Sequence, residues 1–131
     1  MKNTPVISIS FFFTGDYFDL DKVSSAMNII PTETRISDSF KITYFAHTEW
    51  SIEIIETDCR AVSVVFEKLI DLLKDKKEII RDICSKNIEV GFTVVIHQKK
   101  EDSLEIVLSR EIINFSASIE AEIGFDLYYY D

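Results

Sequence analysis

The sequence has 131 residues, of which 47% are hydrophobic and 28% charged, a composition typical of a folded globular chain rather than a disordered one. Its formal net charge of −9 disfavours nucleic acid as a partner, because phosphate binding needs clustered Lys and Arg. No window approaches the roughly 18 apolar residues of a membrane span, so we expect a cytoplasmic protein without a membrane partner. Three Gly and two Pro leave little room for linkers, and we expect a single domain over residues 1–131.

The chain opens with a pattern that predicts a strand followed by a capped helix. Residues 7–13 alternate between large apolar side chains at odd positions and mainly Ser at even ones, which is typical of a strand with one buried face. Asp19 is the expected N-cap of the helix, and an apolar stripe runs through residues 23–30. We expect Pro31 to end this helix.

The next segment predicts a polar loop and then a pair of strands. Residues 32–41 are polar and are expected to form an extended loop. Residues 42–45 and 49–55 are typical of strands, and a turn at residues 46–48 would join them as a hairpin. In the second strand, Trp50 and its alternate neighbours point one way, and Glu53 and its neighbours the other.

An amphipathic pattern follows and predicts a long helix. Thr57 or Asp58 is the expected N-cap, the run 74–77 indicates a break, and Asn87 is the expected C-terminal cap. The apolar stripe, spaced by three and four residues, consists of Val62, Phe66, Leu69, Leu73, Ile80 and Ile83.

The last third predicts two further strands, a helix and a final strand. Residues 88–97 alternate strictly, and residues 104–108 alternate after a polar run, so we expect the two to form an antiparallel hairpin. Ser109 is the expected cap of a short helix, and residues 123–130 form the last strand.

These elements follow the order βαββαββαβ, which favours the α+β class. We expect an antiparallel or mixed sheet with helices packed on one face. A ferredoxin-like βαββαβ core with an added strand, helix and strand fits this order.

Several short motifs carry a family resemblance over nearly the whole chain. They are the apolar strand Phe11–Phe13, the Gly15-Asp16 turn, the helix start Phe18-Asp19, the pair Pro31-Thr32, the strand start Trp50-Ser51-Ile52, and a short helix from Ser109 to Ala121 leading into Asp126-Leu127-Tyr128. In these the chain resembles the bacterial family domain of unknown function 4279. Leu20 and Asn28 depart from the proline and glycine of that pattern. The resemblance implies a small cytosolic α+β protein, with some relatives acting as immunity partners of secreted toxins.

The residue pattern does not favour a metal site, a cofactor or an enzyme. His47 and His97 have no Cys or His partner nearby in sequence, so we expect no metal ion. Cys59 and Cys84 stand in unrelated contexts, and we expect free thiols, as is usual in a reducing cytoplasm. Cys84 falls near the apolar stripe of the long helix, which favours a packed thiol over a nucleophile.

Carboxylates and tyrosines are predicted on the face of the sheet opposite the apolar side chains. Tyrosine offers a large amphipathic contact area and carboxylates pair with Lys and Arg, so this face would suit a basic protein. The simpler alternative is a solvated face, and Asp126 has its own alternative as a buried carboxylate bonded to backbone. The candidate partner-binding residues are Glu53, Glu89, His97, Glu105, Asp126, Tyr128 and Tyr130.

The leading hypothesis is a cytoplasmic module that binds a basic protein, and its specific form is an immunity protein that neutralises a basic toxin. Residues 100–131 hold most of the excess of acids, which supports this hypothesis. The alternative is a small-molecule-binding or catalytic domain, which would need an apolar pocket with converging polar groups near Cys59 or His97. A homodimer formed through a sheet edge or the terminal tyrosines is a third alternative.

Overall fold

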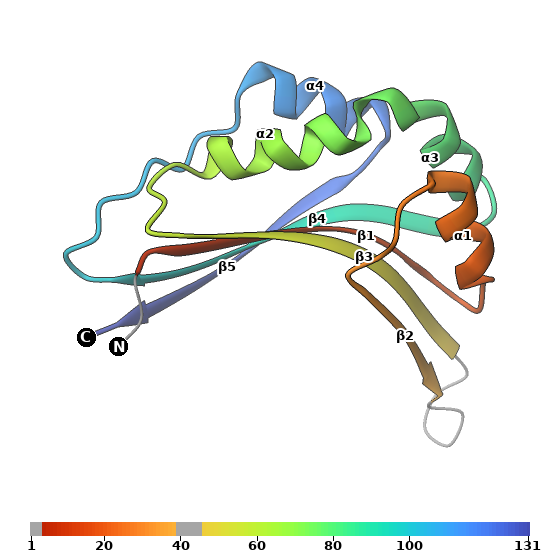
Figure 1. Cartoon of the computed structure of the whole chain (residues 1–131), viewed down its shortest axis with the longest axis horizontal. Helices are drawn as coiled ribbons and strands as arrows, with labels where there is room; N and C mark the ends of the chain where they lie inside the picture. The colour runs from red at the N-terminus through yellow and green to blue at the C-terminus, as the bar shows by residue number, and fades with distance from the viewer. Residues whose placement is uncertain (1–3, 39–45) are drawn as a thin grey trace.

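The computed structural model describes residues 4–38 and 46–131, which form a five-stranded sheet with helices on one face (Figure 1). In chain order the elements are β1 (Val6–Gly15), α1 (Leu20–Met27), β2 (Glu33–Asp38), β3 (Ala46–Thr57), α2 (Val62–Leu73), the 3₁₀ helix η1 (Lys74–Lys76), α3 (Lys77–Cys84), β4 (Ile88–Lys99), α4 (Arg110–Ser118) and β5 (Glu122–Tyr130). The sheet order is β2-β3-β1-β4-β5, in which β4 and β5 are parallel and all other neighbours antiparallel. The predicted α+β class with a mixed sheet is confirmed.

The first four strands form a βαββαβ core of the ferredoxin-like kind. β1 lies between β3 and β4, and β2 pairs with the outer side of β3. α1 connects β1 to β2, and α2 with α3 connects β3 to β4. The addition to this core is only α4 and β5, whereas the prediction added a strand, a helix and a strand. Because β5 runs parallel to β4, it needs the crossover that α4 supplies.

The centre of the core is β1, whose odd residues are large and apolar. Ile7, Ile9, Phe11 and Phe13 are each 0% exposed, as the alternation predicted. Their aromatic rings continue into the neighbouring elements, with 5.1 Å between the ring centroids of Phe11 and Phe13 and 5.4 Å between those of Phe11 and Phe92. Burying each such side chain contributes roughly 1.5–3 kcal/mol, so this layer supplies much of the driving force for folding.

Helix α1 begins as predicted and ends earlier than predicted. Asp19 Oδ1 accepts hydrogen bonds from the N–H groups of Asp21 at 3.0 Å and Lys22 at 3.3 Å, so it is the N-cap. The helix ends at Met27 because Asn28 adopts the left-handed conformation (φ 55°) that closes a helix. The prediction that Pro31 ends the helix is therefore wrong, and Ile30 is 92% exposed instead of joining the stripe.

The region around β2 differs from the prediction. Residues 33–38 form an edge strand that pairs with residues 46–51 of β3, where a loop was expected. The side chains of residues 33–36 are all exposed, so this stretch has no alternation of buried and polar residues, and backbone pairing defines the strand. The predicted turn at residues 46–48 is wrong because these residues belong to β3. The strand predicted at residues 42–45 lies outside the described residues.

The long helical segment has the predicted stripe and the predicted break, but not the predicted cap. All six residues of the stripe are at most 7% exposed, and η1 separates α2 from α3 at the predicted run. The helix begins at Val62, with Ala61 at the cap position and no side-chain cap, so neither Thr57 nor Asp58 caps it. Asn87 adopts a left-handed conformation (φ 64°) in the turn before β4, while Ser85 is the C-cap of α3.

The predicted hairpin between residues 88–97 and 104–108 is wrong. Residues 103–109 form no strand, because the outer side of β4 is paired with β5. The segment crosses to α2 instead, where the N–H of Glu105 donates to the carbonyl of Arg60 at 2.7 Å. Ser109 is the N-cap of α4 as predicted, since its Oγ accepts from the N–H of Ile112 at 3.3 Å.

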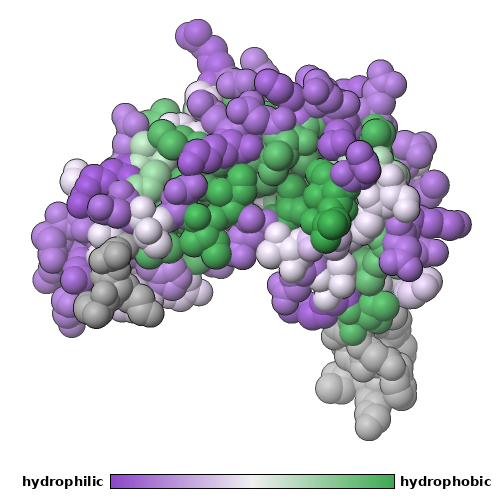
Figure 2. All heavy atoms as spheres, viewed as in Figure 1, coloured by the Kyte–Doolittle hydropathy of each residue, from purple (hydrophilic) through white to green (hydrophobic). Residues whose placement is uncertain are grey.

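The sheet is arched, and the helices lie on its convex side (Figure 1). Within residues 4–38 and 46–131, no helix lies against the concave side. In the space-filling view the outer surface of the helix layer is polar, apolar side chains lie below it, and the molecule is hollowed underneath (Figure 2). The architecture thus leaves one curved side of the sheet accessible.

Candidate functional site

The concave side of the sheet, which we call the open face, collects polar side chains from all five strands. Residues that face each other in the register point to the same side, so Ser10, Glu53 and Thr93 lie together there. The open face comprises Glu33 and Arg35 (β2), Glu49, Glu53 and Ile55 (β3), Ser8, Ser10 and Phe12 (β1), Glu89, Thr93, His97 and Lys99 (β4), and Glu122, Asp126, Tyr128 and Tyr130 (β5).

The structure brings the predicted partner-binding residues together, with one exception. Those on the open face are Glu53, Glu89, His97, Asp126, Tyr128 and Tyr130. Glu105 is not among them, because the strand expected to carry it does not form. Its carbonyl accepts from the N–H of Val62 at 3.0 Å, which places it beside the start of α2.

His97, Tyr128 and Tyr130 form one ring cluster at the border of β4 and β5. The ring centroid of His97 lies 4.9 Å from that of Tyr128 and 5.7 Å from that of Tyr130, with interplanar angles of 10° in both pairs. Nδ1 of His97 is 2.6 Å from the phenol oxygen of Tyr130. The two tyrosines are nevertheless 47% and 42% exposed. The cluster therefore presents aromatic area that is already ordered, which lowers the entropic cost of binding.

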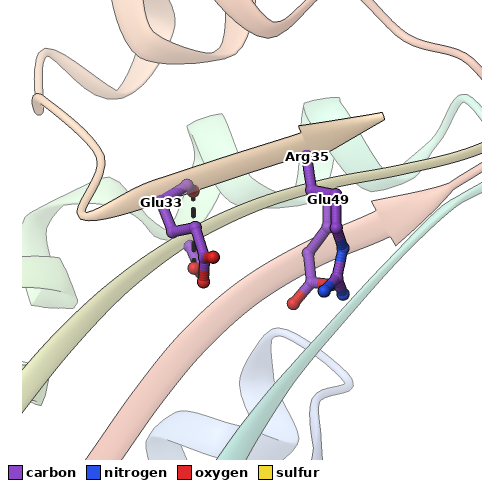
Figure 3. Close-up of polar contacts among 4 residues, drawn as sticks. Glu33, Arg35 and Glu49 are labelled. Carbon is purple, nitrogen blue, oxygen red and sulfur yellow. Dashed lines mark hydrogen bonds and ion pairs between the residues drawn. The ribbon is translucent and has the colours of Figure 1, made fainter. Parts of the chain in front are cut away.

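Two of the carboxylates on the open face are held by neighbouring strands. Glu53 accepts a hydrogen bond from the hydroxyl of Ser8 on β1. Arg35 on β2 forms an ion pair with Glu49 on β3, and Figure 3 shows their side chains and that of Glu33 pointing to the same side. Asp126 is exposed, so its interpretation as a buried carboxylate is wrong.

The charge of the open face is predominantly negative. The carboxylates of Glu33, Glu49, Glu53, Glu89, Glu122 and Asp126 stand against the single charges of Arg35 and Lys99. The helix layer is mixed by comparison, with pairs such as Lys74 and Asp71, whose Nζ and Oδ1 are 3.4 Å apart. A positively charged surface is therefore attracted to the concave side more strongly than to the helices.

A cavity of about 620 Å³ lies at the end of the sheet where β5 begins. Its lining combines apolar side chains with Arg81 and the carboxylates of Glu89, Glu120 and Glu122. Cys84 also lines it, and burial, reinforced by the negative charge of Glu120, raises the pKa of this thiol to about 11. A thiol with such a pKa is protonated at neutral pH, whereas a nucleophile has to be a thiolate.

Cys59, the other candidate thiol, is not among the residues that line this cavity. Cys59 precedes α2, where its Sγ lies 3.6 Å from the carbonyl oxygen of Ala61, and both cysteines are free thiols. In the described part of the chain, no three His, Cys, Asp or Glu side chains are grouped so that they could hold a metal ion. None of the helices described here is both long and apolar enough to cross a membrane.

Sequence reasoning missed several members of the open face. Glu122 could have been found, because it is in phase with Asp126 in the alternation of the last strand. Glu33 and Arg35 carried no signal, since a mostly exposed edge strand has no pattern of burial. The cavity at Cys84 was also not predictable, because it is lined by segments that are distant in sequence.

The comparisons with known proteins identify a family and name no activity. No curated protein and no solved structure matches the chain. The model of one protein family, described as Domain of unknown function (DUF4279), matches residues 5–130. The resemblance seen in the sequence motifs is thereby confirmed over nearly the full length. The chain belongs to the DUF4279 family.

Proposed function

We propose that the protein is a cytoplasmic module that binds a basic protein through the open face. The observation that carries this proposal is a concave sheet face that no helix of the described residues covers. On this face carboxylates outnumber basic groups beside the ordered ring cluster of His97, Tyr128 and Tyr130. Interfaces are enriched in tyrosine, and complementary charge guides the encounter of two proteins.

The two kinds of side chain have separate tasks in this proposal. Glu53, Glu89 and Asp126 attract Lys and Arg of the partner, so added salt weakens the association by screening them. Tyr128 and Tyr130 provide contact area that becomes buried in the complex, and they stabilise the bound state once it has formed.

The partner class that we propose is a basic toxin. The protein covers part of the toxin's surface and thereby inactivates the toxin. The acidic charge of −9 supports this form of the proposal, and the resemblance described in the sequence analysis, with what it implies for some relatives, motivates it. A gene for a secreted toxin next to the gene for this protein would identify the partner to be tested.

The test is co-expression of the protein with such a toxin, followed by recovery of the complex from the cells. We expect growth to be rescued and the complex to dissociate in high salt. The double variant Glu53→Gln, Asp126→Asn removes two charges from the open face and is expected to abolish the rescue. The matched control Asp71→Asn, Glu78→Gln removes two charges from the exposed side of α2 and α3 and is expected to keep it. Absence of rescue and of any salt-released complex would overturn the proposal.

A second candidate function, binding of a small organic cation, is favoured only by the cavity at the start of β5. Glu89, Glu120 and Glu122 could pair with an amine while Ile88 and Ile119 contact its apolar part. The protonated Cys84 argues against thiol chemistry there, and we propose this candidate as a binding function. It predicts that alkylamines increase the Tm of the protein. Glu120→Gln should abolish this increase, whereas the double variant Glu53→Gln, Asp126→Asn should leave it unchanged.

A further inference from the structure

The outer edge of β5 has no strand partner among the described residues, and the charges that could protect it are only the acidic ones of Glu122 and Asp126. β5 spans nine residues at the end of the sheet order, and of the strands in residues 4–38 and 46–131 only β4 pairs with it. Its sequence contains no Lys, Arg or Pro, and its register with β4 runs without a bulge. Natural proteins use such residues, or bulges, to keep exposed edges from pairing with other chains.

The direction of the backbone groups along β5 follows from the rest of the sheet. On β3, the carbonyl of Ser51 accepts from the N–H of Thr32 at 2.8 Å and the N–H of Glu53 donates to Thr32 Oγ1 at 2.9 Å, so odd residues face β2. Backbone direction alternates along each strand, and the registers of β3, β1, β4 and β5 are continuous. Even residues of β5 therefore bond to β4. The residues whose N–H and C=O point to the free side are Ile123, Phe125, Leu127 and Tyr129.

The side chains of β5 give its two faces different chemistry. On the side of the helices, Phe125, Leu127 and Tyr129 are 40%, 43% and 65% exposed, which is unusual for the covered side of a sheet. On the open face, the same strand presents Asp126 and Tyr128. A strand added at this edge would contact apolar side chains on one face and acidic and aromatic ones on the other.

We propose that the free edge of β5 accepts an extended basic segment of the partner, which pairs with it as an additional strand. The segment alternates Lys or Arg, directed to the open face, with apolar residues directed to the side of Phe125 and Leu127. This inference rests on the proposed function and adds to it the mode of binding: backbone hydrogen bonds provide affinity and the alternate side chains provide specificity.

Charge decides between a basic partner and a second copy of this chain. In an antiparallel pair of two β5 strands, Glu122 and Asp126 of both copies would lie on the same face of the joined sheets. Like charges opposed in this way are destabilising, and each chain carries a net charge of −9. A segment with Lys or Arg at alternate positions neutralises the same carboxylates.

The test uses the full-length protein and a synthetic peptide in which lysine alternates with valine over the length of β5. Residue-resolved amide exchange by NMR is expected to change in a specific pattern. Without peptide, the amides of Phe125 and Leu127 exchange rapidly, while those of Asp126 and Tyr128 are protected by β4. With peptide, the odd amides become protected as well.

Two methylated peptides test which edge of the peptide pairs with β5. One carries methyl groups on the backbone nitrogens of its lysines and the other on those of its valines, so each lacks the N–H groups of one edge. We expect one of the two peptides to bind about tenfold more weakly than the unmodified peptide.

A pair of protein variants separates backbone pairing from side-chain contact. Leu127→Pro removes an N–H that points to the free side, so β4 loses no hydrogen bond, and we expect binding to weaken about tenfold or more. Leu127→Ala keeps the N–H and is expected to have the smaller effect. Because the methylated peptides need no change in the protein, they decide the question even if Leu127→Pro does not fold.

The outcomes distinguish this inference from the proposed function. One outcome is that the lysine peptide binds with an affinity that falls with added salt while the odd amides of β5 stay unprotected. In that case the open face binds basic chains, and the proposed strand pairing is wrong. If neither the peptide nor a basic protein binds, the proposed function itself fails. Protection of the odd amides without peptide, together with a dimer in sedimentation, would show that a second copy occupies the edge and would also overturn the inference.

Discussion

β4 and β5 carry similar apolar residues on the helix side of the sheet, yet only those of β4 are buried. Val94 and Ile96 are 0% exposed, while their register neighbours Phe125 and Leu127 are 40% and 43% exposed. The difference lies in what covers them, because the helices pack over β4 and leave the outer part of β5 accessible. Alternation in a sequence therefore predicts the direction of a side chain and says nothing about whether another element covers it.

This difference divides the sheet into a part that stabilises the fold and a part that is available for binding. The covered residues of β1 and β4 form the core with α2. β5 adds exposed apolar side chains, a free backbone edge and the tyrosines of the open face in one strand. Substitutions that compare matching positions in the two parts test this division.

The largest expected effect is the loss of a covered ring. Phe66 of α2 is 0% exposed, and its ring centroid lies 4.8 Å from that of Phe92 on β4. Phe66→Ala leaves a cavity and should lower the free energy of unfolding by about 3–5 kcal/mol. Phe125→Ala also removes a phenyl ring, but from an uncovered position, and should lower the free energy of unfolding by no more than about 1.5 kcal/mol. Urea unfolding measures both, and equal losses would contradict the division of the sheet.

The sequence was sufficient to predict those parts of the fold in which a local rule applies. Alternation identified β1 and its buried face, three- and four-residue spacing identified the stripe of α2 and α3, and cap chemistry identified Asp19 and Ser109. The same alternation placed Glu53 and Asp126 on the open face, because the direction of side chains within a strand depends only on the strand itself.

The parts that could not be predicted depend on which strands become neighbours. Residues 104–108 alternate as a strand does, but β5 occupies the side of β4 on which they would have paired. Residues 33–38 have no alternation and still pair with β3, because an edge strand needs only backbone partners. The ion pair of Arg35 with Glu49 and the ring cluster at His97 are consequences of this pairing, so no local pattern reveals them.

Two glycines extend the comparison of β4 and β5 to the open face. A Cβ at Gly91 of β4 would lie 2.7 Å from the ring of Phe12 and 3.2 Å from the carbonyl oxygen of Glu122, whereas a Cβ at Gly124 of β5 meets nothing within 4 Å. We expect Gly91→Ala to cost about 1–3 kcal/mol because the Phe12 ring and the start of β5 have to move. Gly124→Ala should be neutral or stabilising by about 0.4–1 kcal/mol, since it reduces the freedom of the unfolded chain. Thermal unfolding of the two variants checks both signs, and a stabilising Gly91→Ala would contradict the packing of Phe12.

The partly buried thiol of Cys84 predicts a pH dependence. Burial raises its pKa from 9.0 to about 11, so the folded state favours the protonated thiol. The resulting stabilisation is fully present below pH 9 and is lost as the pH rises towards 11. Because the group is partly exposed, solvent screening should keep the loss to about 1 kcal/mol. Urea unfolding at pH 8 and at pH 11 measures it, and Cys84→Ala is expected to remove this part of the alkaline decline. A decline of the same size in Cys84→Ala would assign it to other groups.

The smallest expected effect on stability belongs to the open face, and it is the most informative for function. Asp126 is exposed on β5 and faces Val95 across the register, so Asp126→Asn should change the free energy of unfolding by no more than about 0.5 kcal/mol. The same substitution removes one of the carboxylates that would meet a basic partner, and its effect should appear in the association rate and in the salt dependence of binding. A stability change of several kcal/mol would mean that Asp126 supports the fold, and the negative charge of this strand would then need no partner to explain it.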